Sequence, residues 1–352
     1  MPIRSLRVQH FRSYADFSIE LSPSTTIISG ANGSGKTNLL EALYVIARGT
    51  SFRGSDAELL QFGKEWWRLD AAIDDADRTA TFDSTRTSGR KQFVIGGNKK
   101  YRLMPQQKIP LVLFEPEDLR LLHGSPVRRR SFIDFLMGQL DPLYSAKVSK
   151  YENALRQRNN LLKTAPGRRD ELFVWDVMLS ELGGFITLAR KQLTSSLHGV
   201  LANTYTQIAE TGDIVGVAYP YYEDTEAVTQ RLLHELQAAH ERDIHFGYTT
   251  VGPHRHDLLF TYNGTPAGSA ASRGEVRSMV LALKLIEVSM IRERTGHTPL
   301  LLLDDVFSEL DNARRQALIR ASSDVQTVVT TTDGDLAQNF TDYSSIVLGK
   351  NP

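Results

Sequence analysis

Eight residues near the start of the chain form a phosphate-binding pattern. The segment Gly30-Ala31-Asn32-Gly33-Ser34-Gly35-Lys36-Thr37 fits G-x-x-x-x-G-K-[ST], and it follows a predicted strand and precedes a predicted helix. Its glycines let backbone N–H groups curl around a β-phosphate at a helix N-terminus, while Lys36 reaches the β- and γ-phosphate oxygens. The Thr37 hydroxyl supplies a ligand for Mg²⁺. A glycine-rich turn without a ligand matches this pattern by chance in roughly one chain in a hundred, so the segment predicts binding of ATP with Mg²⁺.

An apolar run later in the chain ends in two acids. Residues 300–303 are all leucine and predict a buried strand, with Asp304 and Asp305 at its carboxyl end. In a nucleotide-hydrolysing site we expect Asp304 to bind Mg²⁺ and Asp305 to polarise the attacking water, so that Asp305 and Lys36 are the catalytic residues. A core strand capped by acidic turn residues explains this segment equally well when it is taken alone. The phosphate-binding pattern favours the catalytic interpretation.

The segment Ala271-Ser272-Arg273-Gly274-Glu275 opens a predicted helix with one apolar face. Ser272 and Glu275 fit the capping box S-x-x-E, which requires no ligand. Gly274 lies in the first turn, where such a poor helix former is unusual, and a glycine there allows a phosphate to approach the helix N-terminus. We therefore count Ser272, Gly274 and Glu275 as nucleotide-binding candidates, and this role is compatible with capping.

The elements that must position these residues follow from the apolar patterns. A helix is expected at 38–47, directly after the phosphate-binding segment. The C-terminal part alternates strands with helices at 275–292 and 313–321, which is typical of an α/β fold. Alternation predicts strands at 3–8, 17–21, 25–28, 67–73, 79–84, 93–95, 111–114, 245–250, 257–262, 299–303 and 325–330, with a hairpin turn at 96–98.

The middle of the chain has no strand alternation. It predicts long helices at 128–162 and 171–209, separated at Pro166-Gly167, and a further helix at 227–240. A row of residues at three- and four-residue steps suits an antiparallel helical hairpin, and an amphipathic helix on a globular core explains it equally well. The row consists of Val148, Tyr151, Leu155, Asn159 and Leu162.

Composition limits the possible functions. The 352 residues include no cysteine, which excludes disulfides, thiolate metal ligands and a cysteine nucleophile. Lys+Arg and Asp+Glu both total 41, so net charge predicts no polyanionic partner by itself. No apolar run approaches the ~20 residues of a membrane span, and the start MPIRSLRVQHF lacks the apolar core of a signal peptide. We therefore expect a cytoplasmic protein with no membrane partner.

Two local clusters of basic residues could neutralise the phosphates of DNA. Taken alone, each cluster is better explained as a solvated face, and no combination of aromatic and basic residues for stacking bases is evident. The first cluster contains Lys147, Lys150, Arg156, Arg158, Lys163, Arg168 and Arg169, and the second contains Arg90, Lys91, Lys99, Lys100 and Arg102.

In order and spacing, these motifs resemble the ATP-binding-cassette (ABC) heads of chromosome-maintenance (SMC-like) and recombination ATPases, and more narrowly the RecF family of bacterial recombination mediators. The resemblance spans nearly the whole chain. It implies an α/β fold: an ABC-type P-loop ATPase head with an antiparallel β subdomain, plus a helical arm domain. The expected domains are the N-terminal part of the head at 1–125, the arm at 126–243 and the C-terminal part of the head at 244–352. The matching segments are 10–14 (HFRSY), 51–53 (SFR), 114–119 (FEPEDL), 128–130 (RRR), 252–255 (GPHR), 272–275 (SRGE) and 304–305 (DD).

The resemblance also implies roles and partners. Residues 272–275 would be the signature motif that completes the nucleotide site of the opposite subunit in a homodimer enclosing two ATPs, and 308–311 would be the D-loop beside it. The family implies binding to single-stranded, gapped or junction DNA, weak DNA-dependent ATP hydrolysis, and loading of RecA with RecO and RecR in repair, replication and the SOS response. Residues 115–118 are the candidate Q-loop.

Two departures from the cassette pattern bear on turnover. Asp305 falls where most cassette ATPases carry glutamate, so we expect slow hydrolysis, and Thr332 falls where many carry a histidine. Alternatives remain. An architectural DNA clamp with little hydrolysis is compatible with Asp305, and an ABC-type ATPase subunit could act on a protein partner. A transporter ATPase would carry the histidine and lack the helical insertion, and a nuclease of this class would carry a further domain after the head.

Overall fold

The computed structural model describes residues 2–165, 167–222 and 227–349, which belong to two compact units. Unit 1 is formed by Met1–Leu119 and Leu283–Pro352, and unit 2 by Arg120–Ala282. These bounds differ from the expected ones, since residues 244–282 belong to unit 2 rather than to the ATPase head. The reason is sheet pairing within unit 2, where β10 (Leu259–Tyr262) pairs with β9 (Val215–Ala218), a strand that the sequence did not predict.

Unit 1 contains a five-stranded parallel sheet in the order β14-β3-β13-β12-β8. Every residue of β12 and β13 is buried, as expected for strands covered on both faces. Because all strands run in one direction, the segments that follow β3, β8 and β12 lie at the same edge of the sheet. The predicted strands are confirmed, while β14 was not predicted. The strands are β3 (Thr25–Gly30), β8 (Leu111–Phe114), β12 (Leu300–Asp304), β13 (Thr327–Thr331) and β14 (Tyr343–Leu348).

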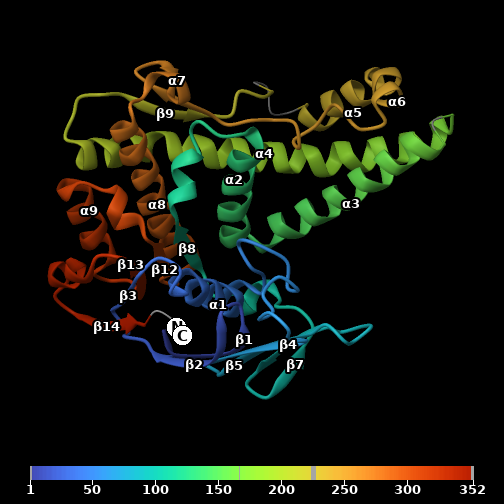
Figure 1. Cartoon of the computed structure of the whole chain (residues 1–352). Helices are drawn as coiled ribbons and strands as arrows, with labels where there is room; N and C mark the ends of the chain where they lie inside the picture. The colour runs from blue at the N-terminus through green and yellow to red at the C-terminus, as the bar shows by residue number, and fades with distance from the viewer. Residues whose placement is uncertain (1, 166, 223–226, 350–352) are drawn as a thin grey trace. The chain divides into compact units, whose positions relative to one another are not determined.

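The second sheet of unit 1 is antiparallel, in the order β2-β1-β4-β5-β6-β7. It forms the expected β subdomain, with the predicted turn at Gly96 and Gly97, both of which have positive φ. Helix α1 (Lys36–Arg48) contacts both sheets of unit 1 (Figure 1). The strands are β1 (Ile3–Phe11), β2 (Tyr14–Glu20), β4 (Trp66–Ile73), β5 (Arg78–Asp83), β6 (Lys91–Ile95) and β7 (Asn98–Lys100).

Unit 1 also contains the C-terminal part of helix α8 (Arg273–Thr295), from Leu283 onward, and its other helices are short. Helix α9 (Asn312–Ser322) agrees with the predicted helix at 313–321, and Asp311 caps it by accepting a hydrogen bond from the backbone N–H of Arg314. Three 3₁₀ helices that lie wholly in unit 1 occupy connections: η1 (Pro105–Gln107), η3 (Val306–Glu309) and η4 (Gly334–Asn339).

Unit 2 is built mainly from helices. The predicted helix at 128–162 is wrong as a single element, because α2 ends at Leu140 and α3 begins at Pro142. Pro142 has no N–H to continue the first helix, and the Asp141 side chain caps the second by accepting a hydrogen bond of 2.8 Å from the N–H of Leu143. The predicted break at Pro166 lies outside the described residues. The helices are α2 (Pro126–Leu140), α3 (Pro142–Thr164), α4 (Arg169–Ala209), α5 (Val228–Ala238), α6 (His240–Phe246) and α7 (Ala267–Ala270), with the start of α8 (Arg273–Thr295). Strand β11 (Thr265–Pro266) joins β10 and β9 in a three-stranded sheet, and the 3₁₀ helix η2 (Pro116–Arg120) lies where unit 2 begins.

Helices α3 and α4 pack along each other as a hairpin, and α5 packs against α4 in turn (Figure 1). Their shared core contains Tyr144 and Tyr151 from α3, Leu179 and Ile186 from α4, and Leu232 from α5. The helical row seen in the sequence therefore serves both a hairpin and a globular core.

Helix α4 is long and apolar enough to cross a membrane by length and composition alone. Its most apolar window has a mean hydropathy of 1.5 and is half buried within the protein. This window differs from the expectation that no apolar run approaches the length of a membrane span. Packing against α3 and α5 accounts for its apolar side chains, as in the core helix of a folded unit.

The predicted strand at 245–250 is wrong. His245 and Phe246 end helix α6, Gly247 takes the left-handed conformation at its C-cap with φ of 71°, and an irregular loop follows. The β-branched Thr249 does not pair with a strand. Its N–H and its hydroxyl both donate to the Asn159 side chain of α3, at 2.8 and 2.7 Å. A side chain distant in sequence thus outweighs the local strand propensity.

A buried charge cluster joins helices α3, α4 and α6 and the loop after α6. The guanidinium of Arg158 donates to Asp176 and Asp243, both at 2.7 Å, and to the Thr249 hydroxyl at 2.9 Å. All three charged side chains are fully buried. Arg158 therefore cannot be one of the DNA-contacting residues of the first basic cluster, because its charge is already compensated inside the unit.

His256, which is buried, and His254, which is half-buried, should make unit 2 sensitive to acid. His254 bonds to the Tyr151 hydroxyl at 2.7 Å, and His256 bonds to the Tyr219 hydroxyl at 2.6 Å and stacks on Tyr221. Burial lowers the pKa of His254 to about 4 and that of His256 to about 3. Below the ordinary histidine pKa of about 6.5, the unfolded chain therefore binds protons that the folded chain does not.

We expect the free energy of unfolding to fall by about 1–2 kcal/mol per histidine between pH 7 and pH 5. Urea denaturation followed by circular dichroism at the two pH values measures this loss. Carboxylates also respond to acid, so His256→Gln is the informative comparison: it should make the pH dependence shallower. An identical pH dependence in the variant would mean that His256 is not a source of the effect.

Candidate functional site

The phosphate-binding loop connects β3 to α1. Gly33 and Gly35 have φ of 80° and 91°, which turns the backbone toward the N-terminus of the helix. At Gly35 a Cβ atom would lie 2.7 Å from the Tyr14 hydroxyl oxygen, so no larger residue fits without displacing that ring. The loop therefore has the strand-to-helix context and the tight curl that a phosphate cradle requires.

Lys36 and Thr37 begin helix α1 at the carboxyl edge of the parallel sheet. The Lys36 ammonium is buried and donates to the carbonyl oxygens of Gly30 and Ala31, at 2.7 and 3.0 Å. The Thr37 hydroxyl donates to Asp304 Oδ1 at 2.9 Å. The structure thus brings the start of α1 and the end of β12 together, as the sequence analysis required.

These oxygen atoms fit a magnesium ion. Asp304 is buried, and its Oδ1 also accepts from the Thr330 hydroxyl at 2.7 Å, which fixes the carboxylate. Hydroxyl and carboxylate oxygens are hard ligands, and Mg²⁺ is usually held by one or two protein oxygens with waters and phosphates completing its shell. Within the described ranges, no group of three or more histidine, cysteine, aspartate or glutamate side chains forms another metal cluster.

Asp305 has a left-handed backbone with φ of 51°. Aspartate tolerates this conformation better than most residues, and the Asp305 N–H is held by the Thr330 carbonyl oxygen at 3.1 Å. Burial raises the pKa of the Asp305 carboxyl, while Lys36 and the backbone N–H of Thr332 act in the opposite direction. Its Oδ1 is buried and has no hydrogen-bond partner among the described residues. An unpaired carboxylate oxygen of this kind is available to a water molecule.

A cavity of about 380 Å³ contains these groups. It includes residues of the phosphate-binding loop, both acids of the β12 end and one residue of the candidate Q-loop. Its lining residues are Asn32, Gly33, Gly35, Lys36, Thr37, Asn38, Arg53, Pro116, Asp304 and Asp305.

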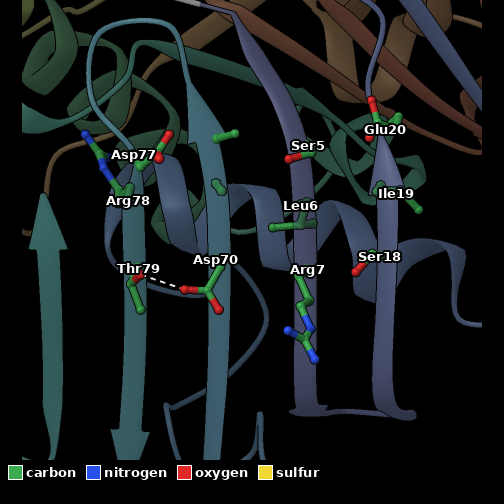
Figure 2. A pocket seen from close by; sticks show the side chains of 12 residues that line it. Ser5, Leu6, Arg7, Ser18, Ile19, Glu20, Asp70, Asp77, Arg78 and Thr79 are labelled. Carbon is green, nitrogen blue, oxygen red and sulfur yellow. Dashed lines mark hydrogen bonds between the residues drawn. The ribbon is translucent and has the colours of Figure 1, made fainter. Parts of the chain in front are cut away.

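A larger hollow of about 500 Å³ lies on the antiparallel sheet (Figure 2). Two of its charged groups are already paired: Asp70 accepts from the Thr79 hydroxyl at 2.6 Å and from Arg68 at 2.7 Å, and Arg7 pairs with Asp16. It contains no helix N-terminus and no glycine loop. The smaller cavity is therefore the better nucleotide site on chemical grounds, despite its size.

A charge network beside this cavity was not predicted from the sequence. Glu41 of α1 is fully buried and accepts hydrogen bonds from Arg12, Arg53 and Ser51. Burial acts to raise the pKa of Glu41, but the bonds from Arg12, Ser51 and Arg53 outweigh it, so the pKa lies below its usual value. Arg53 also donates to Asn38 Oδ1 at 3.0 Å. A single acid within the apolar run of helix α1 was the signal that could have revealed this network.

The candidate Q-loop begins where β8 ends. Glu115 is largely buried; burial and the neighbouring Asp118 raise its pKa to about 7, while Lys284 opposes the shift. Asp118 accepts from the Glu115 N–H at 2.9 Å and forms an ion pair with Lys284 at 3.2 Å. Pro116 is the residue of this segment that lines the cavity.

The segment at 272–275 belongs to unit 2, and none of its residues is among those lining the cavity. The capping box forms: the Ser272 N–H donates to Glu275, and the Glu275 N–H donates to the Ser272 hydroxyl at 3.4 Å. Ser272 and Arg273 are exposed at the start of α8, with Gly274 next to them. Capping therefore explains the local sequence, and the exposed serine stays open to a further partner.

The two sheets around α1, the loop-helix cradle and the acids at the end of β12 define an ABC-type ATPase head of the SMC class. The family model described as "RecF/RecN/SMC N terminal domain" matches residues 2–351, and the chain belongs to that family, in its RecF branch. It is 35% identical to "DNA replication and repair protein RecF" of Agathobacter rectalis, over 95% of this chain and 93% of that protein. It is 37% identical to the protein of the same name from Streptococcus equi subsp. zooepidemicus strain MGCS10565, over 94% and 92%.

Solved structures agree with this assignment. "Structure of the recombination mediator protein RecF-ATPrS in RecFOR pathway" matches with a TM-score of 0.88 and 27% identity, covering 99% of this chain and 96% of that chain. An SMC head bound to the C-terminal winged-helix domain of ScpA matches with a TM-score of 0.58 and 16% identity, which supports the fold alone.

Proposed function

We propose that this protein is an ATP-dependent DNA-binding mediator of recombinational repair. The observation that carries the proposal is the hydrogen bond between the Thr37 hydroxyl and Asp304 Oδ1 in the cavity of the phosphate-binding loop, which places two magnesium ligands beside the cradle. Similarity over about 95% of the chain to proteins named for DNA replication and repair, and to a mediator solved in an ATP-bound form, supports the same function. The work of such a protein is on the chromosome, so we infer a cytoplasmic location.

Each residue of the site has a separate task in this proposal. The backbone N–H groups of residues 30–35 and the Lys36 ammonium bind the phosphates, and Lys36 leaves the Gly30 and Ala31 carbonyls to do so. Thr37 and Asp304 hold Mg²⁺, which would neutralise charge on the β- and γ-phosphates. Asp305 Oδ1 orients the attacking water. As an aspartate it reaches one methylene less far than glutamate, so we propose slow, DNA-stimulated hydrolysis.

A second protomer would complete the site. Ser272, Gly274 and Glu275 are proposed to contact the nucleotide of the partner, so that ATP closes a two-fold homodimer. The exposure of Ser272 at a helix N-terminus supports this role, because the N–H groups there can bind an anion. Cooperation with RecO and RecR in loading RecA belongs to the same proposal, supported by the description of the similar mediator as part of the RecFOR pathway.

The function is tested by fluorescence anisotropy of a gapped DNA duplex titrated with protein in ATP and in ADP, at two salt concentrations. We expect tighter binding in ATP, weakened by salt because counterions compete for the phosphates. Ser272→Arg should abolish ATP-dependent dimers in sedimentation while ATP binding persists. Ser289→Arg, at an exposed position of the same helix, is the matched control. Equal or absent DNA binding in both nucleotides would refute the proposal, and a dimer unaffected by Ser272→Arg would remove the signature role.

One observation favours an architectural clamp as a second candidate. As an aspartate, Asp305 reaches one methylene less far toward a water molecule than the glutamate that most cassette ATPases carry at this position. Single-turnover hydrolysis with gapped DNA separates the two candidates. A clamp would retain ATP for as long as DNA remains bound, whereas the proposed mediator would release phosphate faster with DNA than without it.

A further inference from the structure

Aromatic rings are exposed at the end of helix α6 in unit 2. Phe246 is 52% exposed and Tyr248 is 39% exposed. Their rings are stacked, with centroids 5.7 Å apart and planes 22° from parallel, and the His245 ring meets Phe246 edge-on at 5.2 Å. Rings of this size usually bury much of their surface in the core, so two exposed rings that each contact the exposed Phe246 are a feature that calls for a ligand.

Three cationic side chains lie on or beside the segment that carries these rings. The Arg255 guanidinium lies over the Tyr248 ring, 4.7 Å from its centroid. The Lys163 side chain of α3 lies against Gly247, with its Cγ 3.5 Å from the position that a Cβ would take. Arg242 precedes Phe246 by four residues and therefore shares its face of α6. Lys163, Arg242 and Arg255 are all exposed.

The acids of helix α6 do not neutralise this surface. Asp243 is fully buried and accepts from Arg158 and the Thr250 hydroxyl, at 2.7 and 2.6 Å. Glu241 pairs with Arg169 at 2.6 Å. Three cations and three rings remain at the surface, and we call this set the aromatic platform: His245, Phe246 and Tyr248 with Lys163, Arg242 and Arg255.

The platform stands on a fixed loop. The Thr249 N–H donates to Asn159 Oδ1 at 2.8 Å, and the Thr249 carbonyl oxygen accepts from Arg255 at 3.0 Å and contacts His254 at 3.1 Å. Tyr248 is thereby anchored through its neighbour to helix α3. Because the rings are ordered before any ligand arrives, a ligand loses less conformational freedom on binding them.

We propose that the aromatic platform binds single-stranded DNA, with bases stacked on Phe246 and Tyr248 and phosphates beside Lys163, Arg242 and Arg255. Exposed rings within a cationic surface match the two faces of a single strand, a π-surface and a charged backbone. A duplex keeps its bases stacked on one another, so it has no exposed base face on which the rings could stack. This inference rests on the proposed DNA function and adds the contact that would distinguish a gap from intact duplex.

The test is fluorescence anisotropy of labelled oligo(dT) of about 15 nucleotides, and of a duplex of the same length, with the full chain. The Phe246→Ala/Tyr248→Ala double variant should bind oligo(dT) at least about tenfold more weakly, while duplex affinity changes less than about twofold. Phe62→Ala, which removes a fully exposed ring of unit 1, is the matched control and should change neither affinity. Circular dichroism and ATP binding confirm that the variants fold.

A conservative variant provides an independent readout. In Tyr248→Trp, stacking should preserve the affinity for oligo(dT) and quench the added tryptophan fluorescence. Unchanged oligo(dT) binding in the double variant, or an equal loss on duplex, would overturn the proposal; in the first case the platform faces a protein. If the wild-type chain binds gapped duplex but not oligo(dT), the platform proposal fails and the proposed function stands. If it binds no DNA in ATP, both fail.

Discussion

Replacing Lys36 with alanine should lower the affinity of the protein for ATP by about 100-fold. The ammonium would make charge-assisted hydrogen bonds to phosphate oxygens, each contributing about 1.5–3 kcal/mol. Among the described residues, Arg53 is the one other cation that lines the cavity. Titration with a fluorescent ATP analogue measures the loss. The change also removes the bonds to the Gly30 and Ala31 carbonyl oxygens, so the melting temperature must be measured alongside.

Lys99→Ala is the matched control, because Lys99 is an exposed residue of strand β7 in the same unit. It should leave ATP affinity unchanged. Lys36→Ala should also remove the ATP dependence of DNA binding, since the nucleotide would no longer be bound at working concentrations. Affinity within about threefold of the wild type would show that the phosphates lie elsewhere than in this cavity.

Replacing Arg158 with methionine should destabilise unit 2 by about 3–5 kcal/mol. Methionine occupies much of the same volume but leaves Asp176 and Asp243 buried without their cation. The two carboxylates carry the cost, because each loses a charged partner at 2.7 Å in a buried site. Asp176 keeps its contact with His240 Nε2, and Asp243 keeps the hydrogen bonds from Thr250. Urea denaturation followed by the helical circular dichroism signal measures the difference.

Arg156→Ala is the matched control, since Arg156 lies two residues away on the same helix and is exposed. It should change the free energy of unfolding by less than about 0.5 kcal/mol. Adding Asp176→Asn and Asp243→Asn to Arg158→Met should recover much of the stability, because the unpaired charges are gone. A loss for Arg158→Met no larger than that for Arg156→Ala would contradict the buried cluster.

The fold was predictable where elements obey local rules. Helix α1 and the strands of unit 1 other than β7 and β14 followed from apolar alternation and from the glycine loop. The boundary between α2 and α3 has a local signal, the N-cap residue Asp141 followed by Pro142. The prediction of one long helix relied on apolar spacing alone and did not use this signal. In the loop at 247–250, Gly247 was a local signal for the end of a helix, but the conformation of Thr249 depends on Asn159 and Arg158, side chains of another helix.

The site was predictable to a similar extent. The motif at 30–37 and the acids at 304 and 305 could be placed together, because a parallel sheet brings its carboxyl ends to one edge. The partners of Glu41 come from a turn after β1 and from the loop after α1, and sequence order gives no measure of such proximity. The aromatic platform was missed for the same reason: its rings lie at the end of α6 and in the loop after it, whereas Lys163 lies on α3.

The network around Glu41 has a consequence for the thermodynamics of nucleotide binding. Arg53 borders the cavity, and Glu41 and Asn38 hold its guanidinium in place without any ligand. The rotamer freedom of this long side chain is therefore lost when the protein folds, not when ATP arrives. A calorimetric comparison of wild type with Glu41→Gln would show this as a less favourable binding entropy in the variant, where a neutral amide holds the arginine less firmly.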